Sequence, residues 1–301
     1  MDEIDLKLAL LLLRNSRMPY RKLAEKVELS VNAVHSRIQN LIDSDTIKEF
    51  TAQLSYRALE GCVIMSVDGR SENSDSEDLI SKIGEDERTF RVAAASGNFL
   101  YVQALLRDFK EMNEYVERIS DKAEIKEPEI FIVDMSQVGK LKDFEFSKTD
   151  YKIIHSLQHD ARKSLSDVAK ELNLSAKTVR RRLDEMKDKG AVSFTIKHKP
   201  TYTSDIISFF DYYVKSGHDR KKVIQKIMDE FSPNLYGFSK PVNHPKMMRS
   251  NCWTKNLNQV HEIKRNLREK DYIESVDSRL YYNSKDFDTW RDELLEEKAI
   301  D

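Results

Sequence analysis

Residues 161–192 have the sequence ARKSLSDVAKELNLSAKTVRRRLDEMKDKGAV, which predicts a short helix, a tight turn and a longer second helix. The first helix is indicated by apolar side chains at spacings i, i+3, i+4 and i+7, which fall on one face of an α-helix. These side chains are Leu165, Val168, Ala169 and Leu172. Residues 173–175 (Asn-Leu-Ser) interrupt the spacing, so the first helix is expected to end there.

The second helix has start and stop signals. Ser175 is placed to cap its first turn, because a serine hydroxyl can accept a hydrogen bond from a free backbone N–H group. Gly190 tolerates the left-handed conformation that often ends a helix. One face carries Val179, Leu183 and Met186, and the opposite face carries Lys177, Arg180 and Arg181. A short helix packed across a longer one with a basic outer face is the helix-turn-helix arrangement that enters the DNA major groove.

The same pattern occurs earlier in the chain. Residues 5–47 align without a gap on residues 150–192, at a constant offset of 145. The alignment pairs identical residues at several positions: Leu12 with Leu157, Arg17 with Arg162, Ala24 with Ala169, Val34 with Val179 and Arg37 with Arg182. A gapless match of this length predicts an internal duplication.

Composition and charge restrict the possible partners. The 301 residues suffice for several small domains, and the formal net charge is −2, so attraction to DNA must come from local clusters. Cys62 and Cys252 form no CxxC pair, which indicates no disulfide framework and favours a reducing cytoplasm. The longest apolar run, residues 8–13, is too short to cross a bilayer, and the acidic N-terminus is unlike a signal peptide. We therefore expect a cytoplasmic protein without a membrane partner.

The chain as a whole predicts an α+β fold in which two domain types alternate. After each set of three helices comes a short strand, predicted as a wing, and then the order β-α-β-β-α-β of a ferredoxin-like domain. A helix at the end of the chain is expected to pack on its own domain. The predicted boundaries are 1–56 and 149–199 for the winged helix-turn-helix domains, 57–134 and 200–284 for the ferredoxin-like domains, 135–148 for a linker, and 285–301 for the C-terminal helix.

These features carry a family resemblance. The segments LSVNAVHSRI (Leu29–Ile38) and LSAKTVRRRL (Leu174–Leu183), each followed by βαββαβ, resemble the Lrp/AsnC feast-famine regulators, with two units fused in tandem. The resemblance implies sequence-specific binding of double-stranded DNA, transcription regulation, and ferredoxin-like (RAM-type) domains that dimerise. It also implies an effector site at the strand hairpin, here Gly97, Asn98 and Leu100. Leu100 stands where family members carry an acidic residue, so the carboxylate that would hold an amino group is missing.

Major-groove bases are contacted by side chains on the outer face of a recognition helix, near its start. The candidates are Lys177, Thr178, Arg180 and Arg181 in the second unit and Asn32, His35 and Ser36 in the first. Arg37 and Arg182 lie beside the apolar stripe, so we expect them to contact phosphate or to pair within their own domain. Residues 175–189 contain six Lys/Arg and three Asp/Glu, whereas residues 30–44 contain one of each. The hypothesis is that the second unit supplies most of the electrostatic affinity.

Other classes of function predict different features. An enzyme is not expected, because the sequence lacks a Gly-rich phosphate loop, GxSxG and HExxH, and neither a cofactor nor a metal site is indicated. Two alternatives remain open: a protein-interaction scaffold, and an enzyme like the siroheme decarboxylases, which use paired Lrp-like units. The ferredoxin-like domains are predicted to pair either between chains, in a homodimer, or within one chain as a pseudo-dimer. The homodimer is preferred because the family's sheets associate symmetrically.

Overall fold

The computed structural model describes residues 1–74, 76–133, 141, 144–198 and 205–300. Most of the predicted linker (135–140 and 142–143) and the predicted boundary at residues 199–200 lie outside the described residues. The chain divides into two compact units, each containing segments far apart in the sequence. The helical unit consists of Met1–Gly61, Val138–Tyr202 and Asp288–Asp301, and the sheet unit of Cys62–Gln137 and Thr203–Phe287.

The helical unit contains both copies of the duplicated pattern. The first copy comprises α1 (Glu3–Arg14), α2 (Tyr20–Val27), α3 (Val31–Asp43) and β1 (Ile47–Leu54). The second comprises α6 (Lys148–Ser156), α7 (Leu165–Glu171), α8 (Ala176–Lys189) and β6 (Val192–His198). Both copies begin with a capping box, from Asp2 to Asp5 in α1 and from Ser147 to Asp150 in α6. The duplication therefore extends to the hydrogen bonds that start the first helix of each copy.

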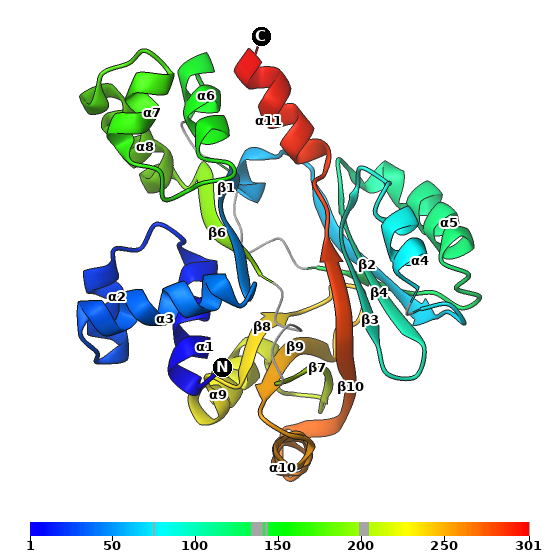
Figure 1. Cartoon of the computed structure of the whole chain (residues 1–301). Helices are drawn as coiled ribbons and strands as arrows, with labels where there is room; N and C mark the ends of the chain where they lie inside the picture. The colour runs from blue at the N-terminus through cyan, green and yellow to red at the C-terminus, as the bar shows by residue number, and fades with distance from the viewer. Residues whose placement is uncertain (75, 134–140, 142–143, 199–204, 301) are drawn as a thin grey trace. The chain divides into compact units, whose positions relative to one another are not determined.

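The two strands predicted as wings do not remain with their own domains. β1 and β6 pair with each other as an antiparallel two-stranded sheet, and Figure 1 shows them side by side. A short strand was predicted after the three helices of each copy, but not the pairing of the two strands. A strand alone leaves its backbone N–H and C=O groups without partners, and pairing between the copies satisfies them.

The sheet unit contains the two βαββαβ repeats. The first comprises β2 (Val63–Arg70), α4 (Glu77–Ile83), β3 (Thr89–Ala95), β4 (Phe99–Leu106), α5 (Met112–Lys122) and β5 (Glu129–Ile132). The second comprises β7 (Ile206–Val214), α9 (Arg220–Phe231), β8 (Leu235–Ser239), β9 (Met247–Thr254), α10 (Leu257–Arg268) and β10 (Ile273–Asp286). The predicted α+β class and element order are thus confirmed.

The two repeats share one eight-stranded sheet with the order β5-β2-β4-β3-β10-β7-β9-β8. They join where β10 pairs antiparallel with β3, as Figure 1 shows. For this pairing, β10 continues past its own repeat, and residues 283–286 pair with β3. At the opposite ends of the sheet, an isolated bridge connects Val133 to Pro241. The ferredoxin-like halves therefore pair within one chain.

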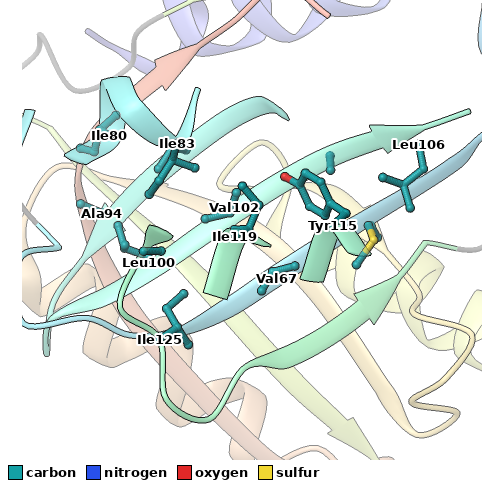
Figure 2. Packing of buried hydrophobic residues seen from close by; sticks show 14 residues of the cluster. Val67, Ile80, Ile83, Ala94, Leu100, Val102, Leu106, Tyr115, Ile119 and Ile125 are labelled. Atoms are coloured by element: carbon teal, nitrogen blue, oxygen red, sulfur yellow. The ribbon is translucent and has the colours of Figure 1, made fainter. Parts of the chain in front are cut away.

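The core of the first half lies between its sheet and its two helices (Figure 2). Val67 on β2 and Leu100 and Val102 on β4 contact the buried faces of α4 and α5, which carry Ile83 and Ile119 among others. Full burial of one such side chain contributes about 1.5–3 kcal/mol to folding. The second half has an equivalent core beneath α9 and α10, which includes Phe210, Val223, Ile227 and Leu267.

The C-terminal helix, α11 (Trp290–Ile300), was predicted to pack on its own domain, and this prediction was wrong. The helix belongs to the helical unit, where it packs against α6 and β1, and not to the ferredoxin-like domain that precedes it. Trp290 and Leu295 are buried, and the Arg291 guanidinium lies 5.1 Å from the centre of the Tyr56 ring. In the described part of the chain, no helix has the length and apolar composition needed to span a bilayer.

Candidate nucleic-acid interface

Helix α8 has the local structure that its sequence predicts. The Ser175 hydroxyl accepts a hydrogen bond from the Thr178 backbone N–H at 3.0 Å. Gly190 ends the helix with φ +70°, a left-handed conformation that glycine adopts without strain. Val179, Leu183 and Met186 are buried beneath the helix. This anchoring fixes which face of α8 is exposed.

The exposed face of α8 is basic. Lys177, Arg180 and Arg181 are exposed, and Arg181 forms a 3.6 Å ion pair with Glu185 in which the arginine side chain is 65% exposed. Such a pair contributes little and breaks easily. Among the described residues, no carboxylate lies within ion-pairing distance of Lys177 or Arg180. Thr178 is half-buried and its hydroxyl contacts Ser175 Oγ at 2.8 Å, so it belongs to the cap as much as to the exposed face.

Arg182 and Arg37 are anchored within their own domains, one of the two roles predicted for them. Arg182 Nε donates to the buried Asp150 carboxylate at 2.7 Å, and Nη1 donates to Glu185 at 2.8 Å. Arg37 Nη1 donates to Asp2 and Asp5, each at 2.7 Å. Asp5 and Asp150 occupy equivalent positions in the duplication. These ion pairs tie each recognition helix to the first helix of its copy.

Replacing Arg182 with methionine is expected to destabilise the helical unit by about 3 kcal/mol, because the Asp150 carboxylate, which is 0% exposed, would be left charged and unpaired. Urea denaturation followed by circular dichroism measures this change. Arg37→Met is the matched control, with an expected loss of about 1 kcal/mol, since its partners Asp2 and Asp5 are 42% and 19% exposed and stay partly hydrated. Equal losses in the two variants would contradict the assignment.

Helix α3 presents a different surface. Ser30 caps it by accepting a hydrogen bond from the Ala33 N–H at 3.2 Å. Asn32, His35 and Ser36 are exposed, as predicted for contact residues. The His35 ring packs against Tyr20, with 5.1 Å between ring centres. The face is thus polar and aromatic, with little charge.

Two arginines that were not proposed as site residues connect the helix-turn-helix copies. Arg17 donates to the carbonyl oxygens of Ala161 and Lys163, and Arg162 donates to the carbonyl oxygen of Met18. Burial lowers the pKa of both guanidinium groups. The sequence alignment of the two copies pairs Arg17 with Arg162, and this identity could have marked both arginines as candidate site residues. Their reciprocal contacts fix one copy against the other.

The sheet unit separates the three predicted effector residues. Gly97 and Asn98 form the exposed β3–β4 turn with φ +80° and +54°, whereas Leu100 is fully buried in the core of Figure 2. Leu100 therefore faces away from any ligand at the turn. Asn98 lines a cavity of 790 Å³ together with Arg70, Ser71, Phe99 and Arg279, among others. Ser71 is 1% exposed, and its hydroxyl has no hydrogen-bond partner among the described residues.

A buried charged cluster connects the two halves of the sheet. Arg249 on β9 donates to Asp211 on β7 at 2.6 and 3.1 Å, and through Nη1 to Asp68 on β2. The guanidinium also lies 4.8 Å from the Tyr101 ring centre and 4.5 Å from that of Phe131. Burial raises the pKa of Asp68 to about 6. No sequence pattern predicts this cluster, since its members are far apart in the chain.

The raised pKa of Asp68 predicts an unusual pH dependence. Because it lies above the ordinary value of 3.8, the folded protein binds a proton between about pH 4 and pH 6 that the unfolded chain does not bind. The contribution of Asp68 to the free energy of unfolding therefore increases as pH falls through 6. From pH 7 to pH 5, wild type should gain about 1 kcal/mol relative to Asp68→Asn in urea denaturation. A constant difference between the two proteins across this range would contradict the raised pKa.

The fold and the candidate site define a protein with two paired helix-turn-helix domains and, in a separate unit, two ferredoxin-like domains that pair within one chain. A model of the AsnC-type helix-turn-helix domain matches residues 1–42 and 147–187. An uncharacterised HTH-type transcriptional regulator of Pyrococcus horikoshii, PH1692, is 27% identical over 120 residues, covering 40% of this chain and 81% of that protein. LrpC of Bacillus subtilis is 29% identical over 107 residues, covering 35% and 74%. The chain thus contains two copies of an AsnC-type helix-turn-helix domain and is similar to Lrp/AsnC-type regulators over single stretches of up to about 40% of its length.

Two solved structures of one protein match nearly the whole chain. The siroheme decarboxylase NirDL covers 99% of this chain and 98% of its own, with a TM-score of 0.57 and 10% sequence identity. At this identity the similarity concerns the fold alone. Among the described residues of the present chain, no group of three His, Cys, Asp or Glu side chains could hold a metal ion.

Proposed function

We propose that this protein binds double-stranded DNA in the major groove and regulates transcription. The observation that carries the proposal is the exposed basic face of α8, with Lys177 and Arg180 outside any described ion pair. Arginine can contact guanine O6 and N7 through two hydrogen bonds, and asparagine can contact adenine in the same way. The names of the relatives, which are HTH-type transcriptional regulators, support the same function.

Selection from random duplexes, followed by a salt titration on the selected sequence, tests this function. We expect a defined motif, with log K falling linearly against log salt at about −0.9 per phosphate contacted. Binding that is salt-sensitive but indifferent to sequence would replace the regulator with an architectural DNA-binding role. Absence of binding at low salt would overturn the proposal and favour the scaffold.

Effector sensing is proposed for the cavity beside Asn98. It is supported by the buried Ser71 hydroxyl, which lacks a partner in the described structure, and by the cationic side chains of Arg70 and Arg279 in the lining. Each of the twenty amino acids, added at millimolar concentration, serves as a probe in thermal unfolding. A ligand that raises Tm in wild type but not in Ser71→Val would support the site. No shift with any of them would contradict amino-acid sensing.

The siroheme decarboxylase alternative is supported by overall fold similarity alone. It predicts that the purified protein binds a coloured tetrapyrrole, so an absorbance titration with siroheme separates it from a DNA-binding regulator. The ferredoxin-like domains pair within one chain through β10 and β3, so the preferred expectation that they pair between chains was wrong. Sedimentation velocity on the free protein measures whether chains associate in another way.

A further inference from the structure

The pairing of β1 with β6 has the form of a two-fold symmetric interface inside one chain. Under the offset of 145, residue 50 corresponds to 195 and residue 51 to 196. Phe50 pairs with Ile196, and Thr51 pairs with Thr195, so each residue pairs with the counterpart of its neighbour. The same reciprocity holds outward along the strands, where Glu49 pairs with Lys197 and Ala52 with Phe194. When residue i contacts the copy of j and j contacts the copy of i, the two copies are related by a two-fold axis.

The arginine contacts obey the same relation. Arg17 donates to the carbonyl oxygen of Lys163, and its counterpart Arg162 donates to that of Met18, the counterpart of Lys163. These contacts and the β1–β6 sheet lie within the helical unit. The helix-turn-helix copies are therefore held as a pseudo-dimer, with α3 and α8 in equivalent positions.

Equivalent positions on the two helices carry different side chains. Asn32 of α3 corresponds to Lys177 of α8, His35 to Arg180, and Ser36 to Arg181. All six side chains are exposed. His35 rests on the Tyr20 ring, whereas no described carboxylate pairs with Arg180. The pseudo-dimer of helix-turn-helix copies therefore has one basic contact surface, on α8, and one nearly neutral contact surface, on α3.

We infer that one chain recognises a non-palindromic duplex, with a guanine-bearing half-site under α8 and an adenine-bearing half-site under α3. The two arginines of α8 can donate two hydrogen bonds each to guanine, whose major-groove edge carries two acceptors. Asn32 of α3 can donate one hydrogen bond to adenine and accept one from it, because the adenine edge carries one acceptor and one donor. A symmetric dimer of identical helices requires two matching half-sites. Here the partner helix is already supplied within the chain, so a second chain is not needed to complete the site.

This inference rests on the proposed function, and the experiment keeps the two apart. The duplex selected by the full-length protein is divided at its centre, and each half is repeated with inversion to give two artificial palindromes. Wild type should bind the selected duplex about tenfold or more tightly than either palindrome, with one chain per duplex in native mass spectrometry. A palindromic selected site, or two chains per duplex, would overturn the inference and leave DNA binding intact. Failure to select any duplex would remove the proposed function itself.

Exchanging the three contact residues between α8 and α3 tests the same inference by changing the protein and not the DNA. The variant Lys177→Asn/Arg180→His/Arg181→Ser gives α8 the contact residues of α3, and Asn32→Lys/His35→Arg/Ser36→Arg does the reverse. All six positions are exposed, so both variants should retain the wild-type unfolding midpoint, which is measured first. The second variant should prefer the palindrome of the α8 half-site over the selected duplex. If the folded second variant still prefers the selected duplex, as wild type does, these residues do not determine which half-site each helix binds, and the inference is wrong.

Discussion

The double variant Arg180→Glu/Arg181→Glu is expected to lose roughly 100-fold or more in affinity for the selected duplex at low salt. Both side chains are exposed on α8, and under the proposed function they would replace counterions along the DNA backbone or contact guanine edges. Reversing their charge removes two favourable contacts and adds repulsion from phosphate. The slope of log K against log salt should also become shallower, by about 0.9 for each of the two arginines that contacts a phosphate and not a guanine edge. Fluorescence anisotropy over a range of salt concentrations measures both quantities.

The matched control lies at the equivalent positions of α3. His35→Glu/Ser36→Glu introduces the same two carboxylates but removes no arginine, and we expect a loss below about tenfold. The comparison separates a leading role of α8 from a general effect of negative charge near DNA. Equal losses in the two variants would refute the hypothesis that the second unit supplies most of the electrostatic affinity.

Replacing Arg249 with methionine is expected to reduce the free energy of unfolding by about 3–5 kcal/mol. Arg249 is 8% exposed and is hydrogen-bonded to both Asp68 and Asp211, so its loss leaves two carboxylates facing each other in the interior. Breaking a buried ion pair by removing one partner costs more than the pair contributes, because the remaining charge stays desolvated. Urea denaturation at pH 7, with thermal unfolding as a second probe, measures the change.

Two further variants define the cause of that loss. Arg279→Met removes a neighbouring guanidinium that is 3.5 Å from Asp211 but 34% exposed, and about 1 kcal/mol or less is expected. The triple variant Arg249→Met/Asp68→Asn/Asp211→Asn removes the unpaired charges together with the arginine and should recover part of the stability. If the triple variant is less stable than Arg249→Met, the loss arises from packing against Tyr101 and Phe131 and not from unpaired charge.

The sequence determined the elements whose signals are local. The order of helices and strands in each βαββαβ repeat was predicted as it occurs, because side-chain periodicity and chain breaks depend only on near neighbours. The Ser175 cap and the Gly190 stop of α8 were predicted for the same reason. The apolar spacing within α8 also predicted which face of the helix is exposed. The duplication was also visible in the sequence, and with it the class of fold.

The tertiary structure decided which of these elements pair. β1 joins β6, β10 extends to β3, and α11 packs on α6, each across a long separation in sequence. Strand pairing depends on backbone hydrogen bonds that every residue type except proline offers, so a strand's sequence identifies its exposed face better than its partner. The charged cluster around Arg249 arises in the same way, from three strands brought together by the sheet. Local periodicity thus specified the two kinds of domain, whereas non-local backbone pairing joined each kind within a single chain.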